Sequence, residues 1–224
     1  MRPLISGDAR VVGASRTDAG VHALGQVASV HADEALVPDT VMAALNARLP
    51  RDIRVRASRV VPEEFHARRA AHRKRYGYLL STDAVLSPFL RGFAWHVGRP
   101  LDTGPMVEAA ASLRGKHDFA AFCAAPGRAR DPVCRVHAVR IVARRGRIGI
   151  LVSADSFLHH MVRNIVGTLV EVGLARRPVQ WVPDVLAGRD RRAAGPTAPS
   201  EGLYLLRVRY GWPIFPGGRP APAD

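Results

Sequence analysis

The residues best placed to do chemistry lie in one short segment, residues 13–23 (GASRTDAGVHA). It reads as the end of a strand followed by a tight turn, with the carboxylate of Asp18 held between Thr17 and Gly20. A carboxylate fixed in this way could act as a nucleophile or accept a proton. An Asp before Ala-Gly in a turn is more often structural, because its side chain bonds the backbone downstream. On this motif alone the structural interpretation is favoured.

The charge balance of the chain indicates a polyanionic partner. The 224 residues include 33 Lys+Arg against 19 Asp+Glu, a formal net charge of +14, and only Lys74 and Lys116 are lysines. The planar guanidinium of arginine binds phosphate oxygens through two parallel hydrogen bonds, and excess positive charge is typical of nucleic-acid-binding proteins. A coding bias toward Ala, Arg, Gly and Pro is the alternative explanation. We favour a nucleic acid.

Phosphate contacts are expected from arginines in or beside candidate loops, since the backbone phosphates dominate affinity for nucleic acids. Most surface arginines are simply solvated. The five arginines proposed to bind phosphate are chosen from their position and from the charge of the chain. The expected phosphate-binding residues are Arg68, Arg69, Arg128, Arg130 and Arg135.

The remaining composition excludes several classes of protein. Cys123 and Cys134 stand ten residues apart without a Cys-x-x-Cys pattern, so they indicate neither a zinc site nor a disulfide framework. No apolar run approaches a membrane span, and the N-terminus lacks the apolar core of a signal peptide. The clustered acidic ligands of a metal-dependent nuclease are not found either. We expect a cytoplasmic protein without a membrane segment.

The elements that must position Asp18 form a mixed pattern of strands and helices. Residues around Pro38 start an apolar-periodic helix that stops before Pro50, since the residue preceding proline leaves the helical region. Residues 144–146 separate two alternating segments and predict a hairpin. Strands are expected at 8–14, 24–30, 53–57, 76–80, 93–97, 139–142, 148–152 and 203–210, and further helices at 105–113, 157–172 and 179–186. The fold class is therefore predicted to be α+β.

The helix expected at 157–172 carries one apolar stripe, with Arg163 at its edge. Arg163 lies about 120° from the centre of the stripe, at about 100° per residue, so it can leave the core margin and enter a neighbouring cleft. His159 and His160 suggest a metal site, but adjacent histidines on a helix diverge and make poor co-ligands. Core packing or contact with RNA is favoured, and no metal is expected.

From residue 13 to residue 210 the sequence resembles the tRNA pseudouridine synthase A (TruA) family. The run Arg-Thr-Asp-x-Gly-Val-His-Ala around Asp18 is similar to the family signature, and other motifs follow in the same order. They are residues 44–55 (ALNARLPRDIRV), 65–68 (FHAR), 74–78 (KRYGY), 117–119 (HDF), 157–169 (FLHHMVRNIVGTL), 193–199 (AAGPTAP) and 202–205 (GLYL). One short motif can arise by chance, whereas an ordered set across nearly the whole chain does not.

The resemblance implies that the chain isomerises uridine to pseudouridine at positions 38, 39 and 40 of the tRNA anticodon arm. The reaction breaks the bond from ribose C1′ to uracil N1, turns the base, and joins C1′ to C5. Because it is redox-neutral and needs no external energy source, no cofactor is expected. By resemblance, Asp18 is the catalytic carboxylate, which attacks C6, attacks C1′ or abstracts a ribose proton. Arg163 would pair with it, favouring and orienting its ionised form.

The resemblance also implies roles around the target base. Tyr76 corresponds to the tyrosine of the uracil pocket, whose face can stack on the base, whereas the strand pattern alone makes Tyr76 and Tyr78 core residues. Arg16 would fill the gap left by the flipped nucleotide. Leu203 would pack against the pocket, although a buried strand leucine describes it equally well.

The family fold implies two similar α+β, ferredoxin-like halves with a mixed, largely antiparallel sheet and a central catalytic cleft. A homodimer in which one tRNA contacts both subunits is expected. The expected division is an N-terminal half at residues 1–63 carrying Asp18, a C-terminal half at 64–215, and a Pro/Gly-rich tail at 216–224.

Two features depart from the family pattern. Ser15 stands where many relatives have glycine, and the strand and most of the long helix that usually open the family's chains would lie before Met1. Either the start of the chain is placed too far downstream, or this is a short form of the family. The absence of that strand and helix would expose sheet backbone and apolar surface, so we expect a form extended upstream to be more stable. The alternative function is a catalytically impaired tRNA-binding module of the same fold. The presence of Asp18, Tyr76 and Arg163 together argues against it.

Overall fold

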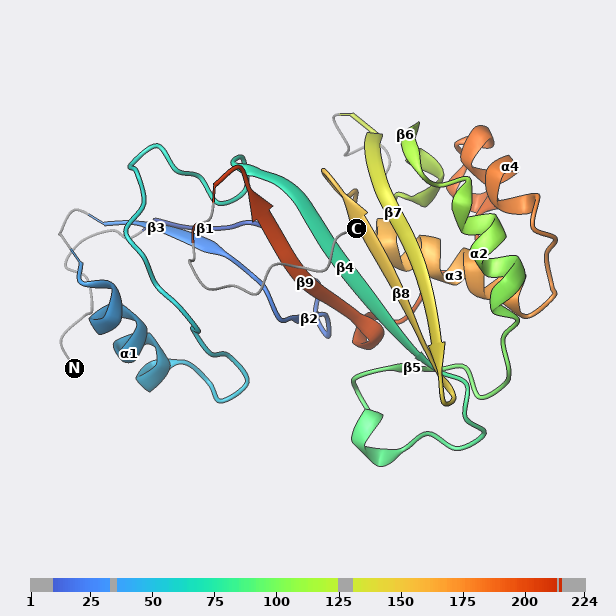
Figure 1. Cartoon of the computed structure of the whole chain (residues 1–224), viewed down its shortest axis with the longest axis horizontal. Coiled ribbons are helices and arrows are strands. Elements are labelled where there is room, and N and C mark those ends of the chain that lie inside the picture. The colour runs from blue at the N-terminus through green and yellow to red at the C-terminus, as the bar shows by residue number, and fades with distance from the viewer. Residues whose placement is uncertain (1–9, 33–35, 125–130, 213, 215–224) are drawn as a thin grey trace. The chain divides into compact units, whose positions relative to one another are not determined.

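The computed structural model in Figure 1 describes residues 10–32, 36–124, 131–212 and 214. Contacts divide the chain into a smaller unit (Met1–Ser15, Val27–Ala71 and Tyr210–Asp224) and a larger unit (Arg16–Gln26 and His72–Arg209). These units differ from the halves expected from the sequence. Residues 64–71 group with the smaller unit, and the segment that carries Asp18 groups with the larger one.

In its described residues, the smaller unit contains a two-stranded antiparallel sheet and one helix. Strand β1 (Arg10–Gly13) pairs with β3 (Ala28–His31), and α1 (Pro38–Arg48) begins at a proline and ends before Pro50, as predicted. The predicted strand at 53–57 is wrong. The side chain of Asn46 bonds both backbone groups of Val55, at 2.8 Å to its carbonyl and 2.7 Å from its N–H, which takes the place of a strand partner.

The larger unit is built on a seven-stranded mixed sheet in the order β2-β9-β4-β8-β7-β6, with β5 beside β4. The pairs β4–β8, β8–β7 and β7–β6 are antiparallel, and β2–β9 and β4–β5 are parallel. The β7–β8 hairpin turns at Arg145 and Gly146, both at positive φ, as the favoured hairpin turns require. The strands are β2 (His22–Ala23), β4 (Ala71–Ser81), β5 (Trp95–His96), β6 (Gly115–Asp118), β7 (Val133–Arg144), β8 (Arg147–Ala154) and β9 (Leu203–Tyr210).

One predicted strand is divided between two partners. Residues 24–30 were expected to form a single strand, but β2 ends at Ala23 and β3 starts at Ala28. The N–H groups of Leu24 and Gly25 both donate to the carbonyl of Leu205 (2.9 and 3.1 Å). A Cβ at Gly25 would lie 2.4 Å from the carbonyl oxygen of Leu206, so only glycine permits this approach of the chain to β9.

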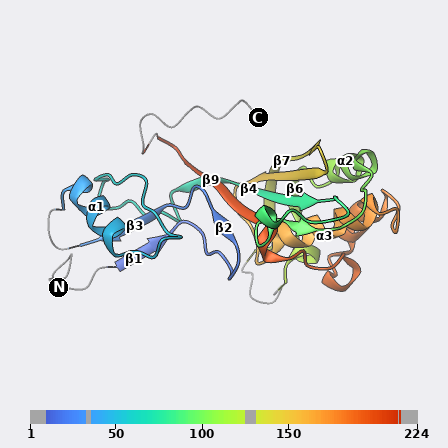
Figure 2. The ribbon, with the colours of Figure 1, turned by 90° about the horizontal axis from the view of Figure 1, so that it is seen from below.

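Three α-helices accompany this sheet, and Figure 1 shows them grouped together beside it. They are α2 (Thr103–Ala111), α3 (Met161–Gly173) and α4 (Trp181–Gly188); short 3-10 helices lie at η1 (Pro88–Leu90), η2 (Ala120–Phe122), η4 (Arg191–Ala193) and η5 (Ser200–Gly202). Figure 2 shows α3 on one side of β4 and β7. The apolar stripe predicted for α3 is buried, with Ile165, Val166 and Leu169 all at 0% exposure.

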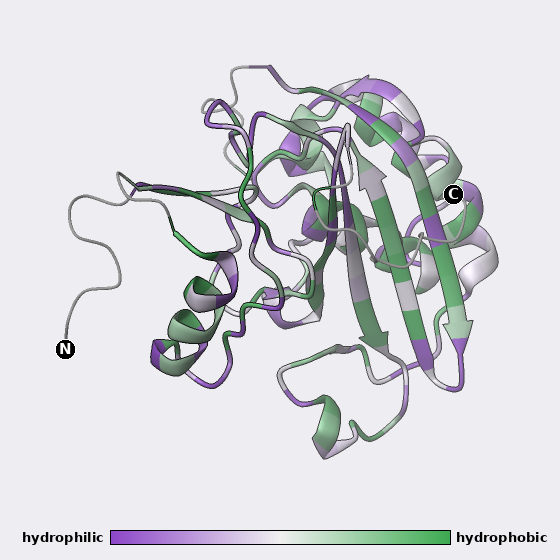
Figure 3. Cartoon of the chain, turned by 60° about the vertical axis from the view of Figure 1, so that its left-hand side comes forward, coloured by the Kyte–Doolittle hydropathy of each residue, from purple (hydrophilic) through white to green (hydrophobic). Residues whose placement is uncertain are grey.

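The chain is therefore an α+β protein, as its sequence pattern predicted, with the mixed sheet that the family resemblance implied. Figure 3 shows hydrophobic residues interleaved with hydrophilic ones along the long strands of the larger unit, the pattern of a sheet with one buried face. Among the described residues, no helix has both the length and the apolar character needed to cross a membrane.

Candidate active site

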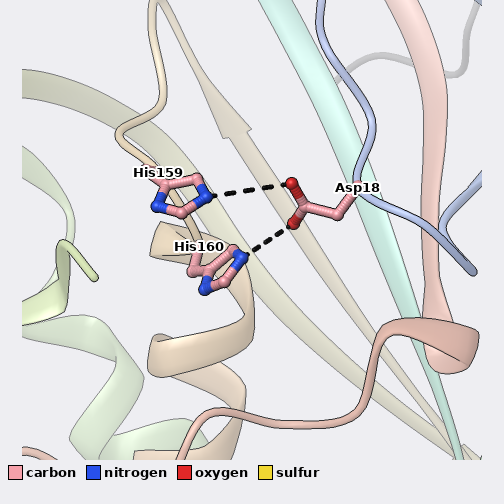
Figure 4. Close-up of side chains that lie close together, drawn as sticks. All are labelled: Asp18, His159 and His160. Atoms are coloured by element: carbon pink, nitrogen blue, oxygen red, sulfur yellow. Dashed lines mark ion pairs between the residues drawn. The ribbon is translucent and has the colours of Figure 1, made fainter. Parts of the chain in front are cut away.

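Asp18 lies in a tight turn immediately before β2. Its carbonyl accepts a hydrogen bond from the N–H of Val21 (3.0 Å), and Gly20 has a φ of 79°. This φ is one that residues with a Cβ rarely adopt, so the backbone conformation of the turn favours glycine. The turn leaves the Asp18 side chain 37% exposed and directs its carboxylate toward the start of α3 (Figure 4).

Arg163 meets this carboxylate from the first turn of α3. Its Nη1 donates to Asp18 Oδ2 at 3.3 Å, and its Nε donates to the carbonyl of Ala198 at 2.7 Å. The side chain is only 14% exposed. The backbone carbonyl thus holds the base of the guanidinium while its end neutralises the carboxylate, a charge-assisted contact of the stronger kind. The structure brings Asp18 and Arg163 together, as the helix periodicity and the family resemblance suggested.

Two imidazoles face the same carboxylate. The Nε2 of His160 lies 3.0 Å from Asp18 Oδ2, and the Nε2 of His159 lies 3.9 Å from Oδ1 (Figure 4). The two rings stack with their centroids 3.9 Å apart. The expectation that these histidines diverge on a helix is wrong, because α3 begins only at Met161 and His160 adopts a left-handed conformation (φ 59°).

The surroundings of His160 disfavour its charged form. Burial lowers its pKa below the ordinary value, with further lowering by Arg163 and His159, while Asp18 acts in the opposite direction. A neutral imidazole carries one N–H, and a carboxylate only accepts. The His160 nitrogen facing Asp18 is therefore the protonated one, and it donates a hydrogen bond to the carboxylate.

The same three side chains could hold a metal ion. The ligand atoms of Asp18, His159 and His160 all lie within 4.8 Å of one another, and imidazole nitrogen with carboxylate oxygen suits zinc or a similar ion. However, the guanidinium of Arg163 competes with any cation for Oδ2. We assign no metal to this group.

The other residues expected near the base also lie in the larger unit. Tyr76 is buried on β4, with its ring edge-on to Phe157 at 4.9 Å between centroids. Phe157 precedes the two histidines by only two residues, so Tyr76 packs against the segment that leads into the site. Leu203 is buried at the start of β9, and Arg16 is exposed two residues before Asp18. Their roles toward a uracil stay predictions.

The arginines expected to contact phosphate are dispersed. Arg68 and Arg69 are exposed in the smaller unit, where their backbone N–H groups donate to His66 Nδ1 at 3.2 Å. Arg135 is exposed on β7, opposite Lys116 of β6. Arg128 and Arg130 lie outside the described residues.

The sequence prediction placed phosphate contacts in loops and so missed a denser group of arginines on strands. We call it the arginine cluster; it consists of Arg73, Arg75, Arg140, Arg207 and Arg209, on strands β4, β7 and β9. Burial and the four neighbouring cations lower the pKa of Arg75, which shows that the charges lie close together. Such a concentration of positive charge fits a phosphate backbone. Arginine at alternate positions of two strands was the signal available in the sequence.

The loop that supplies Ala198 is anchored by Tyr78, which is 1% exposed. Its hydroxyl donates to the carbonyl of Pro199 at 2.6 Å, so the Tyr78→Phe variant leaves a carbonyl next to Ala198 without its donor. We expect this variant to lose about 1–3 kcal/mol of unfolding free energy, as measured by urea denaturation. Tyr204→Phe, which removes an exposed bond to the Phe93 carbonyl, is the matched control and should cost less. Equal midpoints for Tyr78→Phe and wild type would contradict this anchoring.

Comparisons with known proteins show the family of the chain. Residues 3–68 and 109–211 match the model of a family described as tRNA pseudouridine synthase. A tRNA pseudouridine synthase A of Ralstonia nicotianae is 45% identical over 203 residues, covering 88% of this chain and 73% of the relative. Those of Myxococcus xanthus (44%; 92% and 78%) and Ruminiclostridium cellulolyticum (41%; 92% and 85%) are similarly close. The chain belongs to the tRNA pseudouridine synthase family, and its relatives of the A type are isomerases.

Proposed function

We propose that this chain isomerises uridine to pseudouridine at positions 38–40 of the tRNA anticodon arm, with Asp18 as the catalytic carboxylate. The observation that carries the proposal is the geometry around Asp18. Its carboxylate is accessible, yet a largely buried guanidinium and an imidazole hold it in one orientation. An ionised, oriented and accessible carboxylate is what the reaction requires.

The chemistry divides between Asp18 and its neighbours. Asp18 acts at C1′ or C6 of the uridine, or on a ribose proton, so that the bond from C1′ to N1 breaks and C1′ then joins C5. Arg163 favours the ionised carboxylate by its charge. Tyr76 and Leu203 hold the freed uracil while it turns, and Arg16 fills the place of the flipped nucleotide.

Binding of tRNA rests on the positive charge of the chain. The arginine cluster on β4, β7 and β9, together with Arg68, Arg69 and Arg135, would contact phosphates and release counterions. We further propose that the enzyme works in the cytoplasm as a homodimer, in keeping with the family resemblance. The binding-module alternative does not explain why a mostly buried Arg163 faces the Asp18 carboxylate.

The choice of uridines is tested with tRNA transcripts that keep a uridine at only one of positions 38, 39 and 40. The proposal predicts pseudouridine at each retained position, detected by chemical derivatisation and primer extension. A transcript with cytidine at all three positions is the control and should stay unmodified. Pseudouridine found only outside the anticodon arm would contradict the assigned positions, although the isomerase assignment would stand.

A further inference from the structure

His160 has an uncommon backbone conformation. Its φ of 59° and ψ of 9° lie in the left-handed region, which residues other than glycine seldom adopt, although histidine does so more often than most. It is also the N-cap residue of α3, but its side chain makes no capping hydrogen bond. Serine, threonine, aspartate or asparagine would cap the helix, and glycine would relieve the backbone. Helix formation therefore does not explain a histidine here.

The contacts of the His160 side chain do explain it. Its Nε2 and the Nη1 of Arg163 converge on one oxygen of Asp18, Oδ2, at 3.0 and 3.3 Å. His159 Nε2 lies 3.9 Å from the other oxygen, Oδ1, which is too long for a hydrogen bond. Two donors thus fix Oδ2 and leave Oδ1 the less engaged oxygen.

The backbone and the neighbouring ring hold His160 in place. The His160 carbonyl accepts from the N–H of Asn164 (2.9 Å), and the His159 carbonyl accepts from Ala124 (3.0 Å). The His159 ring covers one face of the His160 ring. The left-handed residue is thereby locked on both sides, and backbone strain of this kind concentrates at functional sites.

We propose that His160 is a positioning residue, which fixes Oδ2 of Asp18 together with Arg163 and so presents Oδ1 to the uridine. The inference rests on the proposed role of Asp18. A free rotation of the carboxylate would exchange the two oxygens, and misplacement of a reacting atom by about 1 Å can cost on the order of 100-fold in rate.

His160→Gly separates positioning from structure. Glycine accepts the left-handed conformation, which offsets part of the stability lost with the contacts of the ring, so the melting temperature should stay within a few degrees of the wild type. The loss of the donor should lower the single-turnover rate of pseudouridine formation by about 10- to 100-fold, with the tRNA Kd unchanged. His160→Gln places an amide N–H near the position of Nε2 and should recover most of the rate. His159→Gln, the adjacent control, should lose less than His160→Gly.

Several outcomes would overturn the inference. It fails if His160→Gly turns over at the wild-type rate, or if its loss appears in the tRNA Kd instead. It also fails if His160→Gln is no faster than His160→Gly. Asp18→Asn is assayed in parallel. An inactive Asp18→Asn beside a fully active His160→Gly rejects the positioning role alone, whereas an active Asp18→Asn rejects the proposed function itself.

Discussion

Replacing Asp18 with asparagine should lower pseudouridine formation by about 1,000-fold or more, the scale on which loss of a catalytic base or acid acts. Asparagine keeps the shape of the side chain but removes the charge. Arg163 would keep its bond to the Ala198 carbonyl, so the surrounding fold should persist. The affinity for tRNA should stay within a few fold, because it rests on phosphate contacts.

The measurement is a single-turnover assay with saturating enzyme, together with filter binding of the same tRNA. Asp190→Asn is the matched control, because Asp190 also pairs with an arginine, Arg192, but on the exposed surface (3.0 Å). It should react at the wild-type rate. An Asp18→Asn variant that reacts as fast as Asp190→Asn would remove Asp18 from the chemistry.

Arg163→Leu should have the second-largest effect, a fall of about 100-fold or more in the single-turnover rate, as for removal of one preorganised donor. Asp18 would lose the cation that orients it, and the Ala198 carbonyl would lose its donor. Because the side chain is only 14% exposed, stability should also fall, by about 1–3 kcal/mol. The sequence pattern placed Arg163 at the edge of an apolar stripe, and the structure adds its bond to the Ala198 carbonyl.

Two comparisons isolate the pair. Arg176→Leu breaks a surface pair with Glu171 (2.9 Å) and should change neither rate nor stability appreciably. In the double variant Asp18→Asn with Arg163→Leu, the losses should not multiply, because both act through one carboxylate. If the fold loss in rate of the double variant equals the product of the two single losses, Arg163 does not act through Asp18.

Local rules predicted much of the fold. The proline at each end fixed the limits of α1, the apolar stripe marked α3, and the alternating segments around residues 144–146 gave the β7–β8 hairpin. The errors arose where a distant part of the chain supplies hydrogen bonds. The Leu205 carbonyl accepts from Leu24 and Gly25, where the first residues of the strand 24–30 were expected. The Asn46 side chain takes the place of a strand partner at 53–57. Neither partner can be located by the periodicity of a single segment.

The candidate site was predictable only in part, because some of its contacts also come from distant parts of the chain. Asp18 and Arg163 came from motif resemblance and helix periodicity, and the structure places them in contact. The contact of His160 was missed because it depends on one left-handed residue, which shortens the expected helix and turns the ring toward Asp18. The support from Ala198 was missed because a backbone carbonyl leaves no signature in the residue type.

The central claim, that this chain makes pseudouridine in tRNA, is tested most directly by tritium release. Formation of the bond from C1′ to C5 displaces the hydrogen on C5, so tRNA carrying uridine tritiated at C5 should release label to water as pseudouridine forms. The account predicts release by the wild-type chain in buffer with a metal chelator and no added cofactor, and almost none by Asp18→Asn. A wild-type chain that binds this tRNA tightly but releases no tritium would contradict it and support a binding module instead.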